Sequence, residues 1–179
     1  MDNENKLTSR PAIMAYGAIA VVLAVVVGAL YVAPLMAGPK QAFADYNVGS
    51  GKVAIHGYDT VAYFTEGEPT KGNDEFEHTW EDAKWQFATA TNRDLFKANP
   101  DRYAPQYGGY CALGLAAGEY ADADPNAFTI VDGKLYLNLS IKYRDGVWRK
   151  APKAYLATAT YNWTTNREAL RDNYTEQQH

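Results

Sequence analysis

The sequence predicts an α+β domain, in which small antiparallel β-hairpins pack with short helices, preceded by one transmembrane helix. Two observations support this prediction. Asp132-Gly133 separates the apolar runs 128–131 and 134–137, and this dipeptide supplies the positive φ angles of a two-residue type I′ turn. Residues 11–39 contain no charged side chain, which is typical of a segment that crosses a bilayer as a helix.

Composition excludes several classes of protein. The chain has 179 residues, of which 47% are hydrophobic and 21% charged, and a single cysteine, so it is neither a disordered polyampholyte nor a disulfide-stapled miniprotein. Its 17 basic and 21 acidic residues give a net charge of −4, which argues against nucleic acid as a partner. The single cysteine excludes an internal disulfide and a zinc site of several thiolates.

Residues 12–37 are predicted to form a single membrane anchor. Lys6 and Arg10 precede this segment, whereas only Lys40 follows it closely, so the positive-inside rule places residues 1–11 in the cytoplasm. The location is then a bacterial inner membrane, with the C-terminal domain in the periplasm. Gly28 is a candidate position for close packing against other membrane helices.

A cleaved signal peptide is the alternative, because the small residues before Asp45 allow cleavage after Ala44. The apolar run exceeds the usual 7–15 residues of a signal peptide, which favours a retained anchor. After it we expect a linker at 38–52, a globular domain at 53–163 and a polar tail at 164–179.

Local patterns predict the elements of the exported domain. Alternating aromatic residues over 76–87 indicate a hairpin that turns at 81–82. A helix over 92–98, capped by Thr89 or Thr91, is expected to turn Leu95 and Phe96 inward and to stop before Pro100. A second helix is expected over 151–159, and the run 61–64 is compatible with either a strand or a helical turn.

Five segments of the chain carry a resemblance to a known family: 53–64, 85–87, 92–96, 99–112 and 131–138. Together they resemble the YHS-domain proteins of bacteria, over roughly residues 53–163. The resemblance implies an α+β fold but no particular activity. Metal-binding members of that group carry two cysteines just after the second hairpin strand, and here Ala88 and Asn92 occupy the matching positions.

The loop that contains Cys111 is a candidate ligand or interaction loop. Gly108 and Gly109 let its backbone approach a neighbour closely, and Tyr110 adds an aromatic side chain. Cys111 could present a thiolate there for a thiol-dependent enzyme or redox sensor. We favour the other interpretation, a small buried apolar residue, because free cysteine is among the most buried residue types.

Two histidines are candidate ligands. His56 lies on a turn close to Asp59, which could orient its imidazole as a base or ligand; the alternative is an ordinary turn histidine. Asp59 is itself a candidate ligand or interaction residue, like Gly108, Gly109 and Tyr110. His78 shares its strand face with aromatic residues, which favours a packed role. If folding brought His56, His78 and Cys111 together, they could hold copper or zinc, since imidazole and thiolate suit such ions.

The sequence thus predicts a non-catalytic, membrane-anchored domain that serves as an accessory or interaction subunit. The expected partners are other transmembrane subunits of an inner-membrane complex and the lipid bilayer, with no nucleic acid and no required cofactor. A periplasmic copper- or zinc-binding protein is one alternative. A thiol-dependent enzyme or redox sensor that uses Cys111 is the other.

Overall fold

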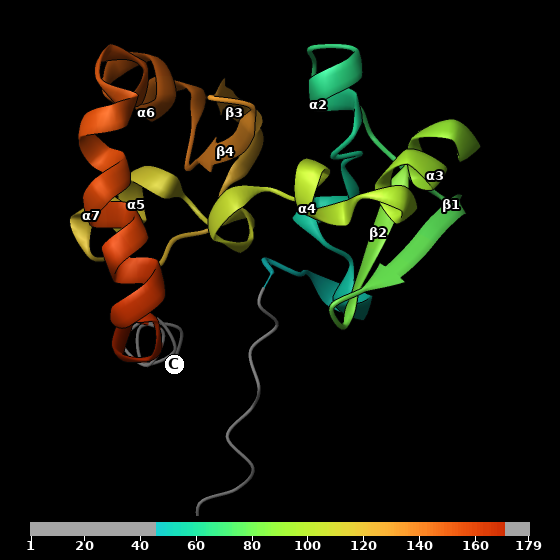
Figure 1. Ribbon diagram of the computed structural model, residues 1–179, viewed down its shortest axis with the longest axis horizontal. Coiled ribbons are helices and arrows are strands. Elements are labelled where there is room, and N and C mark those ends of the chain that lie inside the picture. Colours follow the sequence, from blue (N-terminus) through green and yellow to red (C-terminus); the bar gives the residue numbers. More distant parts are fainter. Residues whose placement is uncertain (1–45, 171–179) are drawn as a thin grey trace, which may run out of the picture. The chain divides into compact units, whose positions relative to one another are not determined.

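A computed structural model describes residues 46–170, and residues 1–45 and 171–179 are not described (Figure 1). The described part is α+β, with two antiparallel hairpins and several helices, so the predicted fold class is confirmed for it. The predicted anchor at 12–37 lies outside the described residues, and none of the helices within 46–170 has the length and apolar character needed to span a bilayer. The elements are η1 (Ser50–Lys52), η2 (Ile55–Gly57), α2 (Ala62–Thr65), β1 (Asn73–Trp80), β2 (Ala83–Phe87), α3 (Ala90–Ala98), α4 (Pro100–Tyr103), η3 (Gln106–Gly109), α5 (Ala112–Ala117), β3 (Asp124–Val131), β4 (Lys134–Asn138), α6 (Ile141–Gly146), η4 (Trp148–Lys150) and α7 (Pro152–Thr165).

The β3–β4 hairpin has the predicted turn. Val131 pairs with Lys134, and between them Asp132 and Gly133 have φ angles of 51° and 75°. Both angles are positive, as a type I′ turn requires. This prediction is therefore confirmed.

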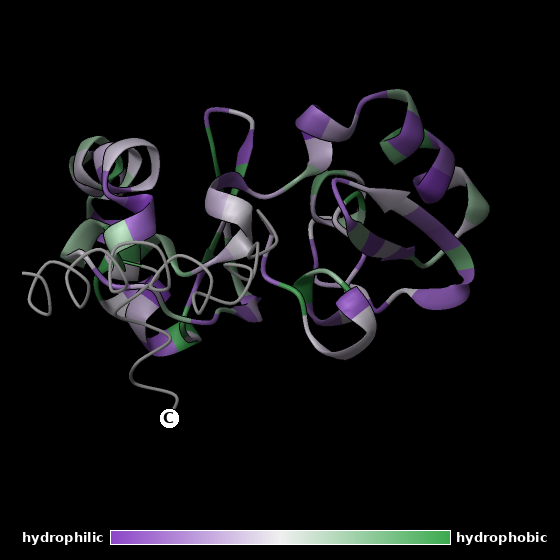
Figure 2. Ribbon diagram, turned by 90° about the horizontal axis from the view of Figure 1, so that it is seen from below, coloured by the Kyte–Doolittle hydropathy of each residue, from purple (hydrophilic) through white to green (hydrophobic). Residues whose placement is uncertain are grey.

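The β1–β2 hairpin is confirmed as well, and its turn is less ordinary. Trp80 pairs with Ala83, and the two turn residues Glu81 and Asp82 have φ angles of 49° and 57°. A glutamate rarely adopts the left-handed conformation because its Cβ crowds the backbone. Figure 2 colours most of β1 hydrophilic, in keeping with a strand in which no residue is buried.

Helix α3 begins at Ala90, two residues before the expected start, and ends at Ala98 as predicted. It differs from the prediction in the direction of one side chain. The Thr89 hydroxyl accepts a hydrogen bond from the Asn92 amide at 3.1 Å, which caps the helix. Phe96 is fully buried, whereas Leu95 is 38% exposed, so the inward orientation expected of Leu95 is wrong. Successive helical residues are about 100° apart, so only one of these two neighbours can face the core.

Two further helices resolve points left open by the pattern. The run 61–64 is helical, because α2 spans Ala62–Thr65. Helix α7 begins with Pro152 in its first turn, as expected, but continues to Thr165. Trp163, beyond the expected end, packs against buried residues, and this contact extends the helix.

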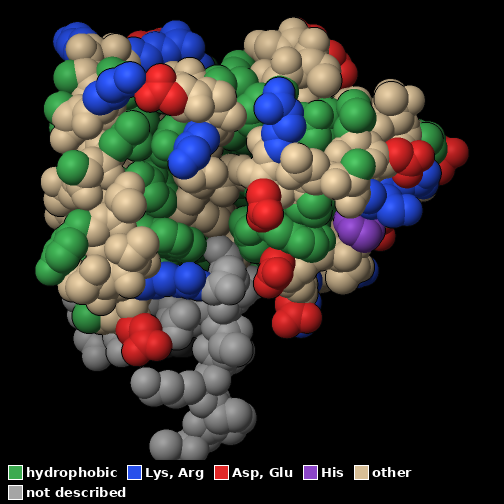
Figure 3. Space-filling model, viewed as in Figure 1, with side chains coloured by type: hydrophobic (Ala, Val, Ile, Leu, Met, Phe, Trp, Pro, Cys, Tyr) green, Lys and Arg blue, Asp and Glu red, His purple; other side chains and the backbone are tan. Residues whose placement is uncertain are grey.

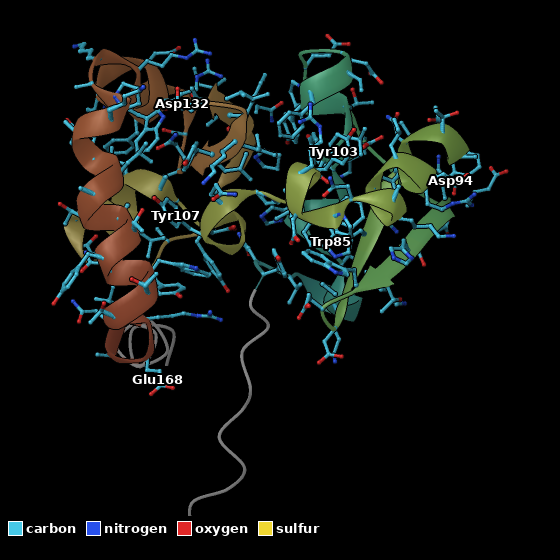
Figure 4. The ribbon with its side chains drawn as sticks, viewed as in Figure 1. Trp85, Asp94, Tyr103, Tyr107, Asp132 and Glu168 are labelled. Carbon is cyan, nitrogen blue, oxygen red and sulfur yellow. The ribbon has the colours of Figure 1, made fainter. Side chains whose placement is uncertain are left out.

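The apolar residues form two clusters. The first lies around β2 and α3, where Trp85 and Phe96 pack with ring centroids 4.9 Å apart (Figure 4). The second lies between α5, α7 and β4 and includes Tyr107 and Trp148. Strand β4 serves both, because Leu135 and Leu137 enter the first cluster and Tyr136 the second.

Candidate functional site

A cavity of about 350 Å³ opens beside the point where the described chain begins. Of the residues that the structure describes, four aromatic side chains line it, together with two carboxylates and one guanidinium. We call it the aromatic pocket. Its size falls within the range of about 300–1,000 Å³ that is common for small-ligand sites. The lining residues are Tyr46, Trp80, Glu81, Asp101, Pro105, Gln106, Tyr107, Gly108, Trp163 and Arg167.

Each aromatic wall of this pocket is held by other parts of the fold. The Tyr46 ring lies 5.2 Å from that of Trp80, and the next residue, Asn47, donates its amide to the Gly108 carbonyl at 2.7 Å. On the opposite wall the ring of Tyr107 lies 6.1 Å from that of Trp163, and the hydroxyl of Tyr107 lies 2.9 Å from that of Thr160. The walls are thus preorganised.

The described lining of the aromatic pocket carries more negative than positive charge. Burial, then the carboxylates of Glu81 and Asp101, raise the pKa of Tyr46 to about 12. Within residues 46–170 neither carboxylate is part of an ion pair. The Arg167 guanidinium lies 4.4 Å from the centroid of the Trp163 ring. Figure 3 shows acidic side chains bordering hydrophobic ones on the viewed face.

A second cavity, of about 250 Å³, contains Cys111 in its wall and is otherwise mainly apolar. Cys111 is 2% exposed, and its Sγ accepts hydrogen bonds from the amides of Gly114 at 3.3 Å and Leu139 at 3.2 Å. Burial raises the pKa of the thiol, and these amide hydrogen bonds offset the rise only in part. The interpretation of Cys111 as a buried apolar residue is therefore confirmed. The cavity, called the Cys111 pocket, is lined by Cys111, Leu113, Gly114, Ala117, Glu119, Ala121, Leu139 and Tyr143.

An exposed apolar surface adjoins the Cys111 pocket. Leu139, Ile141, Tyr143 and Val147 are 46%, 47%, 45% and 36% exposed, and we call these four residues the α6 patch. Leu139 and Tyr143 belong both to the patch and to the pocket wall. Large apolar side chains gathered in this way usually mark a surface that contacts another molecule.

His56 is oriented by an acid, but not by the one expected. Its Nε2 lies 2.9 Å from Oδ1 of Asp122, and the same oxygen accepts a hydrogen bond from Asn47 Nδ2 at 2.6 Å. Burial opposes ionisation of Asp122, but the hydrogen bonds from Asn47, His56 and Ala123 outweigh it and hold its pKa below the usual value. The backbone of His56 has a φ of 53°, so this turn is in the left-handed region.

Asp59 is a structural residue and does not contact His56 through its carboxylate. It is fully buried, and Oδ1 accepts the amides of Val61 and Ala62 while Oδ2 accepts the amide of Ala88 and Nδ2 of Asn92. The expectation that Asp59 orients His56 is wrong. Sequence proximity suggested that pair, whereas the carboxylate serves the start of α2 and the end of β2 instead.

The three predicted metal ligands have different surroundings. His78 pairs across the hairpin with Trp85, and its ring centroid lies 6.4 Å from that of Phe96, in keeping with a packed role. Burial, then Lys97 and Arg93, lower its pKa. Among residues 46–170 no group of three or more His, Cys, Asp and Glu side chains could hold a metal ion, so His56, His78 and Cys111 do not form one there.

The loop predicted to bind a ligand is divided between two roles. Gly108 lines the aromatic pocket. Gly109 has a φ of 80° and packs against Ile55, and the buried Tyr110 ring lies 4.7 Å from that of Tyr120. Gly28, the predicted packing position in the anchor, lies outside the described residues.

The sequence reasoning missed most of the aromatic pocket. Its walls come from segments as distant as Tyr46 and Arg167, and no local pattern joins them. The one available indication was Glu81, an acidic residue in a tight turn between two aromatic strands.

A comparison with protein-family models, curated proteins and solved structures found no match for this chain in any of the three.

Proposed function

We propose that this chain is a membrane-anchored, periplasm-facing domain of YHS type, and that it acts as a non-catalytic accessory or interaction subunit of a membrane protein complex. The observation that carries the proposal is the α6 patch. Its four residues lie within nine consecutive positions of the chain, and two of them, Leu139 and Tyr143, line the mainly apolar Cys111 pocket. This is the arrangement expected of a surface that receives an apolar side chain of a partner.

The chemistry around Cys111 supports a non-catalytic role. A nucleophilic cysteine needs a thiolate and an adjacent base. Here burial raises the thiol pKa, and the hydrogen bonds to Sγ come from backbone amides. His56 is engaged by Asp122 rather than by the thiol.

The short segment between the predicted anchor and the domain, residues 38–45, supports the proposal that the partner is another membrane subunit. Eight residues separate the predicted end of the anchor at residue 37 from Tyr46, and an extended chain of eight residues spans at most about 28 Å. The domain therefore works close to the bilayer surface, where the extramembrane segments of other subunits lie. We propose that the occupant of the α6 patch is an apolar segment of such a subunit.

The test is purification of the full chain from its native membrane in a mild maltoside detergent, followed by native mass spectrometry. The unaltered chain is expected in a complex well above 19.8 kDa. A Leu139→Ser, Tyr143→Ser double variant should lose the partner. Tyr161→Ser is the matched control, because Tyr161 is 56% exposed but lies on α7, outside the patch.

Two results would contradict the proposal. One is an unaltered chain that migrates as an isolated monomer, and the other is a double variant that copurifies with the same partner at the same yield. Gly28→Leu examines the anchor separately, since close helix contact depends on small residues. The unfolding free energy of each variant is measured in parallel to exclude loss of the fold.

A further inference from the structure

We propose that the aromatic pocket binds a quaternary alkylammonium group, either that of a free molecule such as choline or that of a phosphocholine lipid headgroup. This inference goes beyond the proposed function. It concerns different residues from the α6 patch and does not depend on a protein partner.

The pocket combines aromatic ring faces with negative charge, the two features that recognise such a cation. The aromatic faces come first. Aromatic faces attract cations through the ring quadrupole, and they favour bulky ammonium groups that are weakly hydrated. Tyr46 and Trp80 form one such wall, and Tyr107 stands on the other. The Arg167 guanidinium already lies over the face of Trp163, at 4.4 Å, so a cation is accommodated by an aromatic ring of this pocket within the chain itself.

The charge of the lining favours a cation with a single charge. Among the described lining residues, Glu81 and Asp101 contribute two negative charges and Arg167 one positive charge, which leaves one negative charge in excess. Burial is the largest cause of the raised pKa of Tyr46, and the carboxylates of Glu81 and Asp101 raise it further, so both carboxylates act on the part of the pocket that Tyr46 lines. An ammonium group bound at that end would be attracted by both carboxylates and by the aromatic wall.

A metal ion fits this pocket poorly. Hard cations take six or more oxygen ligands, or retain a shell of water, and soft ones prefer imidazole and thiolate. The lining contains two carboxylates and no histidine or cysteine among the described residues. A cavity of about 350 Å³ is also far larger than a bare ion needs and suits an organic cation.

The experiment is isothermal titration of the full chain, in maltoside micelles that contain no ammonium group, with choline chloride. We expect saturable binding, accompanied by a change in tryptophan fluorescence, because Trp80 and Trp163 line the pocket whereas Trp85 and Trp148 are buried elsewhere. The probe for the charge is 3,3-dimethyl-1-butanol, the uncharged isostere of choline. It should bind at least about tenfold more weakly if the cation is recognised.

Three variants assign the site. Glu81→Gln and Asp101→Asn remove one charge each without changing shape, and each should weaken choline binding several-fold. Asp82→Asn is the matched control, because Asp82 is the other residue of the same turn and does not line the pocket. It should leave the affinity unchanged.

Two lipid additions identify the source of the ammonium group. If the natural ligand is a headgroup, phosphatidylcholine added to the micelles should displace choline, whereas phosphatidylglycerol, which has no ammonium group, should not. If it is a free molecule, neither lipid should displace choline. Both results support the alkylammonium site.

The inference is overturned if choline and its uncharged isostere bind equally, if choline shows no saturable binding, or if Asp82→Asn weakens binding as much as Glu81→Gln. None of these results bears on the α6 patch, whose test is copurification. The two proposals can therefore fail separately.

Discussion

Nε2 of His56 lies 2.9 Å from Oδ1 of Asp122, a contact that joins residues 66 positions apart in the chain. The same carboxylate oxygen accepts hydrogen bonds from Nδ2 of Asn47 and from the backbone amide of Ala123. It therefore links the first described segment of the domain, the turn at η2 and the start of β3.

Because of this arrangement, the unfolding free energy should depend on pH in the acid range. The pKa of Asp122 is lower in the folded chain than in the unfolded chain, so its contribution is complete above the unfolded pKa, about 3.9, and is lost as the pH falls through the folded pKa. Between pH 5 and pH 2 we expect the unfolding free energy of the wild type to fall by more than that of Asp122→Asn. The extra loss is the contribution of one hydrogen-bonded carboxylate, and urea unfolding at each pH measures it. If the difference in unfolding free energy between wild type and Asp122→Asn were the same at pH 5 and pH 2, this account would be wrong.

Asp59→Asn should be strongly destabilising. An amide replaces one of the carboxylate oxygens that accept four N–H groups, so at least one N–H faces another donor in a fully buried place. We expect a loss of about 2–4 kcal/mol in the unfolding free energy, measured by chemical denaturation. Asp94→Asn is the control, because Asp94 points away from the domain in Figure 4, and it should leave the unfolding free energy unchanged.

Cys111 should react slowly with iodoacetamide in the native chain. The thiol is buried and its pKa is raised, so labelling should be about 100-fold slower than in denaturant. Leu139→Ala should accelerate labelling because it opens the wall of the Cys111 pocket, whereas Tyr161→Ala should not. Rapid labelling of the native wild type would instead favour the thiol-dependent enzyme.

Gly72→Ala should disrupt the packing of the chain against β2. A Cβ at this position would collide with the backbone of Gln86 and lie 2.6 Å from the amide nitrogen of Phe87, and the backbone atoms of a strand cannot move aside easily. We expect a loss of about 3 kcal/mol or more in unfolding free energy. Gly146→Ala is the control, since nothing lies within 4 Å of the added Cβ, and an unchanged stability of Gly72→Ala would refute the packing described here.

Metal content tests the ligand set that the sequence suggested. Because His56, His78 and Cys111 have separate surroundings, we expect the purified chain to contain much less than one copper or zinc per molecule after dialysis against either ion. Elemental analysis of the wild type, His56→Ala and Cys111→Ala provides the measurement. Stoichiometric metal that is lost in both variants would show that the two residues share a site after all.

The local elements could be predicted because their causes lie within a few residues. The positive φ angles at Asp132 and Gly133 close a two-residue turn, and the Thr89 hydroxyl caps the helix that starts at the next residue. The orientation of Leu95 was not predictable in this way, because two adjacent apolar residues satisfy the same pattern and only packing selects Phe96.

The candidate sites depend on contacts that no local pattern contains. Asp59 meets Asn92 across 33 positions and Leu139 meets Cys111 across 28, so the partners of these residues are known only once the chain is folded. The sequence by itself determined the fold class of the described domain, its two hairpin turns and the cap of α3, since backbone geometry and short-range hydrogen bonds decide them. Only the tertiary structure decided which acid orients His56, which amides donate to the Cys111 thiol, and that Tyr46, Glu81 and Asp101 meet in one pocket, because long-range packing brings those groups together.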